Sequence, residues 1–535
     1  MKQRGSLKDL RWLRILALSL PILCASWSVA TAQNPLTLSE SRGKQIYVQG
    51  TSGSGKDILA YVGDDLLEVP GSAMACANCH GFDGQGKPEG GVTPSNITWE
   101  ALTKPYGATH ADGRRHPTYT ERGLELAITR GLDPAGNKLL SVMPRYQMSQ
   151  EDLADLVIYL KRLGKDRDPG IGEDKIVIGT AIPATGPLAE MGQAVKAVTT
   201  AFFAELNSQG GIYHRRVELK FSETAETPAA TRANLERFLK DEQIFAMTGT
   251  FIAGAEKEIV PLLAQQEVPL IGPLTLNPQI GFPLNRQVFY LLSGSSGQAR
   301  ALISFVARKP EPRNPVISVV YSRSEINTNV LEAIKDQSKK DALGPPQVFD
   351  YGAGQFDAVA AIKQLRQTSP DVVFFMGRTE ELLSFMNEAE KLRWFPKVFL
   401  PGGSVGAEIF AAPVSFDGKV FFSFPTSPAD QTVEGIKEFR ALAEKYKLPS
   451  RNLAAQISAY SAAKILVEAL KRVGKDLSRE KLIEALEGLY EYPSGLTPAI
   501  TYGPNRRIGA MGAYVVTIDL KGKQFVPAGG WVNIN

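Results

Sequence analysis

The sequence predicts a multidomain protein, in which a small all-α domain precedes a larger α/β domain built as two lobes. The chain of 535 residues is too long for a single hydrophobic core. Its first part, residues 36–165, is rich in glycine and loops and has helical periodicity near both ends. After a polar stretch, short apolar runs alternate with amphipathic helical segments, which is typical of parallel sheets covered by helices.

Residues 1–32 have the pattern of a signal peptide. Five basic residues precede an apolar run of about 15 residues, and small residues at 30–32 provide a cleavage site. The run is short for a membrane span, so we expect cleavage near Ala32/Gln33 and a periplasmic mature protein, rather than a retained anchor. The mature chain would carry 55 basic and 55 acidic residues, so it has no excess positive charge that would indicate binding to nucleic acid.

Residues 76–80 read Cys-Ala-Asn-Cys-His, and this C-x-x-C-H motif predicts one covalent haem c. Two thiols three positions apart on a helical turn can each form a thioether with a porphyrin vinyl group, and the adjacent imidazole can bind the iron. We expect Cys76 and Cys79 to attach the haem and His80 to be the proximal ligand. A redox-active disulfide, or a zinc site that recruits His110 and His116, is the alternative.

Helical periodicity is expected over 40–48 and 150–163, and the predicted distal iron ligand, Met143, lies shortly before the second helix. Ser149 is the expected N-cap of that helix, with acids in its first turn. A methionine placed there can be held rigidly against the haem. Alternatively, Met143 packs in the core and is not a ligand. The distal ligand would then be His110, His116, Met74 or Met148, or the distal position would stay open.

Residues 36–165 resemble a class I-type bacterial cytochrome c. The matching pieces are Arg42–Tyr47, Cys76–Gly86, Tyr119–Asp133 and Leu139–Tyr146. The resemblance implies His/Met ligation of the iron and electron transfer without bond-making, because a six-coordinate iron has no open position for a substrate.

A polar stretch over 166–173, with one proline and two glycines, is the expected linker to the domain at 174–535. We predict strands over 176–182, 217–221, 244–248, 268–271, 316–321, 348–351, 372–376, 398–400 and 420–422. Helices are expected between them over 193–206, 229–239, 256–265, 330–337 and 380–391. This length of pattern predicts two doubly wound lobes.

Residues 174–535 resemble the periplasmic-binding proteins of the leucine/isoleucine/valine type (periplasmic-binding protein type 1). The strongest pieces are Ile178–Gln193, Glu205–Ile212, Val268–Pro278 and Ala459–Leu470. The resemblance implies two lobes that close on a small molecule by hinge motion. It places the three crossovers near 293–297, 423–427 and 504–507.

The candidate ligand pocket lies on loops beyond the carboxyl ends of the strands, where ligands bind in open α/β sheets. Its members are Thr185, Thr250, Phe251, Ala253, Thr275, Leu276, Ile326, Arg378 and Ser404. Amino-acid-binding members of the family use hydroxyls for the ligand carboxylate and an acid for its ammonium. The matching positions here are Ala253, Leu276, Ile326, Arg378 and Gly403, so we expect a ligand other than a branched amino acid. Arg378 would pair with an anion or simply begin a solvated helix.

These observations predict an exported monohaem electron carrier fused to a small-molecule-binding domain. Its partners would be a periplasmic redox protein and the small molecule. The alternative is the substrate-binding component of an ABC-type transporter, with an ABC permease as partner, or a sensory receptor with an accessory haem domain. Residues 174–535 contain one histidine, His214, and no convincing nucleophile–base pair or metal cluster, so we do not expect an enzyme.

Overall fold

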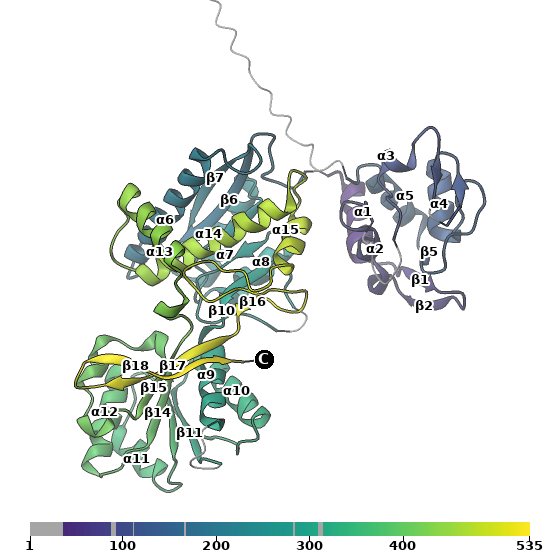
Figure 1. Ribbon diagram of the computed structural model, residues 1–535. Helices are drawn as coiled ribbons and strands as arrows, with labels where there is room; N and C mark the ends of the chain where they lie inside the picture. The colour runs from purple at the N-terminus through teal and green to yellow at the C-terminus, as the bar shows by residue number, and fades with distance from the viewer. Residues whose placement is uncertain are drawn as a thin grey trace, which may run out of the picture. The chain divides into compact units, whose positions relative to one another are not determined.

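The computed structural model describes residues 36–86, 93–110, 112–164, 167–281, 284–308 and 314–534. The chain forms two compact units that divide between residues 166 and 167 (Figure 1). The predicted signal peptide, residues 1–32, lies outside the described residues.

The first unit is helical, as predicted, and also contains two small antiparallel sheets. Its helices are α1 (Leu38–Gln49), α2 (Cys76–His80), α3 (Trp99–Leu102), α4 (Glu121–Arg130) and α5 (Gln150–Leu160). One sheet has the order β2-β1-β5, formed by β2 (Leu67–Pro70), β1 (Leu59–Val62) and β5 (Arg145–Gln147). The other pairs β3 (Ala108–Thr109) with β4 (Arg115–His116). Strands of two to four residues are too short to leave a periodic pattern, so they were not predicted.

Helices α1 and α5 cross at very close range in this unit. A methyl group on Gly43 would lie 2.1 Å from the backbone oxygen of Asp155 and 2.7 Å from Cβ of Tyr159. Beside the crossing, Nε of Arg42 donates to the nearly buried carboxylate of Asp155 at 2.6 Å. Ser149 caps α5, as predicted, because its Oγ accepts from the backbone N–H three residues later. The two ends of the domain are therefore joined by a contact that only a glycine permits.

Lobe 1 of the second unit is built on a six-stranded sheet of order β16-β10-β9-β8-β6-β7, in which every pairing is parallel. Its strands are β6 (Lys175–Ile182), β7 (Arg216–Glu223), β8 (Ala246–Thr248), β9 (Leu270–Ile271), β10 (Val288–Leu292) and β16 (Ile508–Ala510). Its helices are α6 (Ala189–Ser208), α7 (Pro228–Asp241), α8 (Glu256–Gln265), α13 (Val433–Tyr446), α14 (Leu453–Val473) and α15 (Arg479–Glu487). Seven of the eight residues of β6 are buried, so this strand is covered on both faces.

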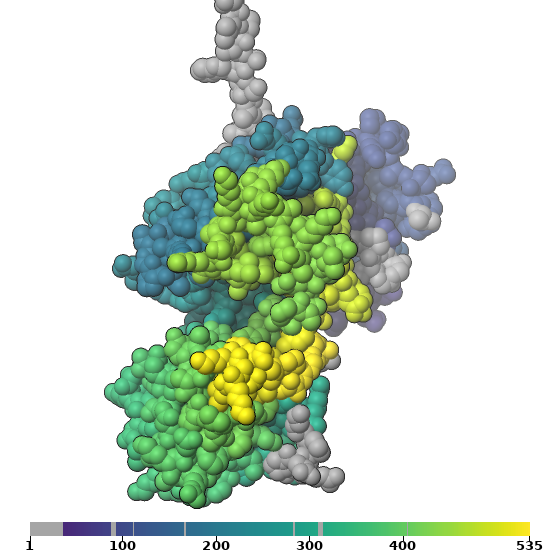
Figure 2. Space-filling view, turned by 60° about the vertical axis from the view of Figure 1, so that its left-hand side comes forward, coloured from purple at the N-terminus to yellow at the C-terminus, as the bar shows by residue number. Residues whose placement is uncertain are grey.

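Lobe 2 has a seven-stranded sheet of order β12-β11-β13-β14-β15-β17-β18. Its strands are β11 (Ile317–Ser322), β12 (Gln347–Tyr351), β13 (Val372–Met376), β14 (Lys397–Pro401), β15 (Val420–Phe424), β17 (Gly512–Asp519) and β18 (Gln524–Asn533). Its helices are α9 (Gly294–Ala307), α10 (Glu325–Lys340), α11 (Ala358–Leu365) and α12 (Thr379–Lys391). The last two strands join antiparallel. The C-terminal residues lie on lobe 2, close to the waist between the lobes (yellow in Figure 2).

Three crossovers connect the lobes. The chain leaves lobe 1 at Ser293, between β10 and α9, and returns over 425–432, between β15 and α13, close to the predicted positions. The third prediction, 504–507, was wrong. β16 still belongs to lobe 1, so the chain crosses at Met511. The hydroxyl of Ser293 donates to the backbone oxygen of Gly512 at 3.0 Å, which joins the first crossover to the third.

The described part of the expected linker, residues 167–173, packs as part of the second unit. The carboxylate of Asp168 accepts from the backbone N–H of Arg479 at 2.5 Å, and Ile171 packs against the core of lobe 1. The side chain of Arg479 donates to three backbone oxygens of the same lobe. Residues 167–173 are therefore bound to lobe 1 and do not form a free linker.

Helix α14 is long and apolar enough to cross a membrane by length and composition alone. Most of it is buried in the core of lobe 1, where Ala462, Leu466 and Leu470 are fully covered. It is therefore placed as the central helix of a folded lobe.

Candidate functional site

Helix α2 brings the two predicted haem-attachment thiols onto one helical turn. Cys76 and Cys79 are both half-buried, and neither is in a disulfide. Burial is the main cause that raises the pKa of Cys76 to about 11, so its thiol is protonated at neutral pH. A redox-active pair would need a stabilised thiolate, and the apolar surroundings of Cys76 do not provide one.

The imidazole of His80 is oriented by the backbone of Ser95. Nδ1 of His80 lies 2.9 Å from the Ser95 carbonyl oxygen, which can only accept, so Nδ1 carries the proton. Burial lowers the pKa of His80, which favours the neutral ring. A neutral imidazole with Nδ1–H bound to a backbone carbonyl presents the lone pair of Nε2, which is the usual second-shell arrangement of a metal-binding histidine. These residues fit a haem held by two thioethers and His80.

The predicted distal ligand, Met143, is half-buried on the loop before β5. The guanidinium of Arg145 fixes this loop by donating to the backbone oxygens of Met143 and, at 3.0 Å, of Leu139. The two alternative methionines, Met74 and Met148, pack against the core of the domain.

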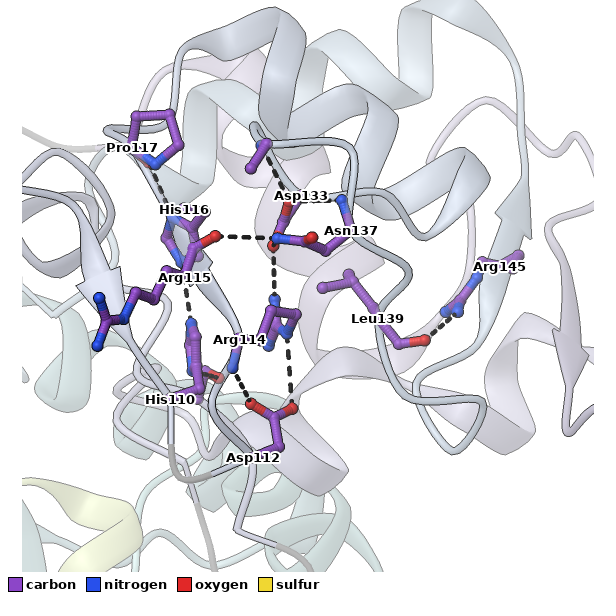
Figure 3. Close-up of polar contacts among 12 residues, drawn as sticks. His110, Asp112, Arg114, Arg115, His116, Pro117, Asp133, Asn137, Leu139 and Arg145 are labelled. Atoms are coloured by element: carbon purple, nitrogen blue, oxygen red, sulfur yellow. Dashed lines mark hydrogen bonds and ion pairs between the residues drawn. The ribbon is translucent and has the colours of Figure 1, made fainter.

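His110 and His116 hydrogen-bond to each other, with their Nε2 atoms 2.9 Å apart (Figure 3). The strands β3 and β4 bring them together, and the buried carboxylate of Asp133 ties the neighbouring loop by accepting from Arg114 at 3.2 Å and Asn137 at 3.0 Å. Among the described residues no group of three or more His, Cys, Asp or Glu side chains could hold a metal ion. The sequence presented these two histidines only as possible ligands. Their mutual pairing could not be predicted, because it depends on a hairpin whose two strands have only two residues each.

In lobe 1, the predicted pocket residues follow β6, β8 and β9. Thr250 is fully buried, and its hydroxyl has no hydrogen-bond partner among the described residues. Phe251 is half-buried, whereas Thr185 and Ala253 are exposed. Thr275 is occupied, because its hydroxyl donates to Oε1 of a buried acid, Glu256, at 2.5 Å.

In lobe 2, the predicted pocket residues lie at the starts of helices. Ile326 is exposed in the first turn of α10. Arg378 is the N-cap of α12: its backbone N–H donates to Glu381 at 2.8 Å, while its guanidinium is largely exposed and 3.5 Å from the same carboxylate. Ser404 belongs to the short turn η2 (Gly402–Ser404), and its side chain lies outside the described residues.

Several described contacts between the two lobes lie near these loops. Leu276 of lobe 1 approaches Gly403 of lobe 2, where a methyl group on the glycine would lie 3.7 Å from the leucine side chain. The amide of Asn329 donates to Oδ1 of Asn277 at 3.2 Å. An ion pair of 3.0 Å joins Lys257, on α8, to Glu325, on α10. Predicted pocket positions from both lobes are therefore brought together at Leu276 and Gly403.

Comparisons with known proteins agree with this division. The family described as Periplasmic binding protein matches residues 175–524, and the family described as Cytochrome c matches residues 71–164. The leucine-, isoleucine-, valine-, threonine- and alanine-binding protein of Pseudomonas aeruginosa is 22% identical over 326 residues, which cover 60% of this chain and 85% of that protein.

Solved structures share the fold of the second unit. A branched chain amino acid ABC transporter protein from Thermus thermophilus with bound valine aligns with a TM-score of 0.55 and 19% identity, over 68% of this chain and 98% of its own. A fatty acid ABC transporter substrate-binding protein from Thermomonospora curvata aligns with a TM-score of 0.54 and 16% identity, over 69% and 95%. The chain thus belongs to the periplasmic binding protein family, as a type 1 member preceded by a cytochrome c domain that implies covalently bound haem c.

Proposed function

We propose that the protein is an exported electron carrier with one haem, whose second domain binds a small molecule. Cys76 and Cys79 hold the haem by thioethers, His80 is the proximal ligand and Met143 the distal ligand. The observation that carries the proposal is the bond from Nδ1 of His80 to the Ser95 carbonyl, because it leaves Nε2 as the metal-binding atom. The bound haem supplies a one-electron couple at its iron.

The chain's own residues prepare this site for electron transfer without bond-making. The hydroxyl of Tyr47 donates to the backbone oxygen of Gly81 at 2.6 Å and so fixes the turn that follows His80. Leu140 and Val142 precede Met143 and are 56% and 46% exposed, so they provide an apolar surface suited to a transient redox partner. We propose a carrier and binding protein that does not act as an enzyme on its ligand.

Covalent attachment is tested on the purified mature chain. Acid denaturation and extraction into organic solvent should leave the haem on the protein, with a mass increase of one haem. The double variant Cys76→Ala/Cys79→Ala should lose this mass increase. Haem that extracts freely from the unaltered chain would refute the proposal. The N-terminal residue of the same sample tests cleavage near Ala32/Gln33.

Distal ligation is tested by Met143→Ala, with Met148→Ala as the matched control on the same segment. Loss of the sulfur ligand should abolish the weak sulfur-to-iron absorption band and lower the reduction potential, because thioether ligation raises it. Met148 packs against the core, so its variant should keep both properties. The assignment is wrong if the Met148 variant, or a variant of His110 or His116, shows these losses instead.

For the second domain, we propose a ligand with a largely apolar surface and no amino-acid zwitterion. Leu276 is 45% exposed and Ile326 is 40% exposed, and Ala253 and Gly403 offer no side-chain group that could hold a carboxylate or an ammonium. Leaving a buried charge unmatched costs several kcal/mol. The fold shared with a fatty acid ABC transporter substrate-binding protein supports this proposal.

Calorimetry with leucine and with a medium-chain fatty acid distinguishes these ligand classes. Leucine should give no binding heat. A true ligand at about 100 times its Kd should stabilise the second unit by about 2.7 kcal/mol. Micromolar binding of leucine would contradict the proposal. It would instead favour the second candidate function, a transport component that works with an ABC permease, which the similarity to the Pseudomonas protein supports.

A further inference from the structure

Ser95 links the proximal histidine to the pair of histidines in the β3–β4 hairpin. His80 binds the carbonyl of Ser95 at 2.9 Å, and the hydroxyl of the same serine lies 3.4 Å from Nδ1 of His110. Nε2 of His110 lies 2.9 Å from Nε2 of His116, and Nδ1 of His116 lies 2.8 Å from the Pro117 carbonyl oxygen. One residue, Ser95, therefore contacts both the proximal ligand and the histidine pair.

The partners of these two histidines determine where each proton lies. The Pro117 carbonyl only accepts, so Nδ1 of His116 carries its proton and Nε2 of the neutral ring must accept. His110 must then donate from Nε2, which leaves its Nδ1 as the acceptor that faces the Ser95 hydroxyl. Nδ1 of His110 is the one imidazole nitrogen of this pair with an available lone pair. A proton added to the pair binds there, and the Ser95 hydroxyl rotates to accept it.

We propose that Nδ1 of His110 is a proton-binding site whose affinity depends on the oxidation state of the haem. The inference rests on the proposed function. Reduction takes one electron from an external one-electron donor, such as dithionite in the test below, and removes one positive charge from the iron. Nδ1 of His110 then takes a proton from hydronium more readily: one O–H bond breaks, its electron pair stays on the water oxygen, and one N–H bond forms. Oxidation by a one-electron acceptor releases the same proton.

The charged groups around His110 set the pH range of this site. Arg114 lies between two carboxylates, 3.6 Å from Asp112 and 3.2 Å from Asp133, and both acids favour a protonated His110 (Figure 3). Burial, followed by Arg114 and His116, outweighs them and lowers the pKa of His110. The ring of His116 packs edge-on against Tyr119, with centroids 4.9 Å apart. The site therefore titrates below the usual histidine range of about 6.5.

The test measures the midpoint potential of the full holoprotein between about pH 4 and 8. The potential should fall as the pH rises through the range in which His110 loses its proton. We expect at least a threefold difference in proton affinity between the two oxidation states, equivalent to about 30 mV. His110→Asn keeps an acceptor for Ser95 but cannot titrate, and it should abolish this slope. His214→Asn is the matched control, since His214 is exposed, lies in the second unit and has a φ of 67° that asparagine tolerates.

Ser95→Ala provides a second variant, because it removes the hydroxyl and keeps the carbonyl that orients His80. The pKa of His110 should fall and the slope should move to lower pH. Nitrogen-15 NMR of the four histidines, in both oxidation states, should show the Nε2–H form of His110 and a pKa that changes on reduction. An unchanged slope in His110→Asn, or a His110 pKa identical in both states, would overturn the inference. Covalent haem with a measurable potential would still support the proposed function in that case.

Discussion

Replacing Gly43 by alanine should lower the free energy of unfolding of the haem domain by about 2 kcal/mol. The new methyl group would lie 2.1 Å from a backbone oxygen and 2.7 Å from a Cβ on α5, atoms that cannot move without shifting the helix. Overpacking of this kind costs about 3 kcal/mol at the upper end of its usual range. Alanine is about 1 kcal/mol more favourable than glycine inside a helix, so the net loss of stability is about 2 kcal/mol.

Hydrogen exchange of the full holoprotein, followed by mass spectrometry of peptides from α1 and α5, measures this effect. A loss of about 2 kcal/mol corresponds to roughly 30-fold faster exchange in both helices. Gly123→Ala is the matched control on α4, because its methyl group would meet its nearest neighbour at 3.4 Å, an ordinary contact. That variant should exchange no faster than the unaltered chain. Unchanged or slower exchange in Gly43→Ala would refute the close crossing of α1 and α5.

Three further predictions concern ion pairs and pH. Glu487→Gln should destabilise lobe 1 by about 3 kcal/mol in denaturant unfolding, because it leaves the buried guanidinium of Arg507 without the carboxylate 2.6 Å away; a loss below about 1 kcal/mol would contradict this. Lys257→Ala removes the exposed ion pair with Glu325 and should cost less than about 1 kcal/mol in the same assay, so a larger loss would show that the pair holds the lobes together. The pKa of His110 is lowered in the folded protein, so just below pH 6.5 the unfolded chain binds more protons than the folded one, and the haem domain should lose stability as the pH falls through this range. His110→Asn should flatten this pH dependence of stability. An unchanged pH dependence in that variant would exclude His110 as its source.

Many of the larger elements could be predicted from the sequence because their signals are local. The buried runs of β6 and β13 and the periodic faces of α8 and α12 match the predicted ranges to within one or two residues. Four strands were missed. β10 and β16 are runs of three to five residues, which cannot be assigned by periodicity. β17 and β18 are longer, but no strand was predicted after residue 422. The wrong third crossover follows from this: without β16, nothing in the sequence marks Met511 as the point of departure.

The candidate sites divide in the same way. The haem motif is contiguous, so the sequence predicts Cys76, Cys79 and His80 as the haem site, but the carbonyl of Ser95 that binds His80 is 15 residues away and no pattern indicates it. The packing of residues 167–173 on lobe 1 could not be predicted either, because the hydrogen bond between Asp168 and Arg479 joins residues 311 positions apart. Pairings over such distances depend on the assembled fold and leave no local pattern.

The strand order of lobe 1 has a consequence for how the protein is made. Every described partner of the haem motif lies within the first 164 residues, so the segment that forms the cytochrome unit is complete early in synthesis. Lobe 1 begins next, yet β16 is contributed only at residues 508–510, after all of α13, α14 and α15. Until then β10 is an open edge, able to pair with another chain. The segment of the cytochrome unit is therefore complete while lobe 1 still lacks a strand, and aggregation would begin at β10 rather than in the cytochrome.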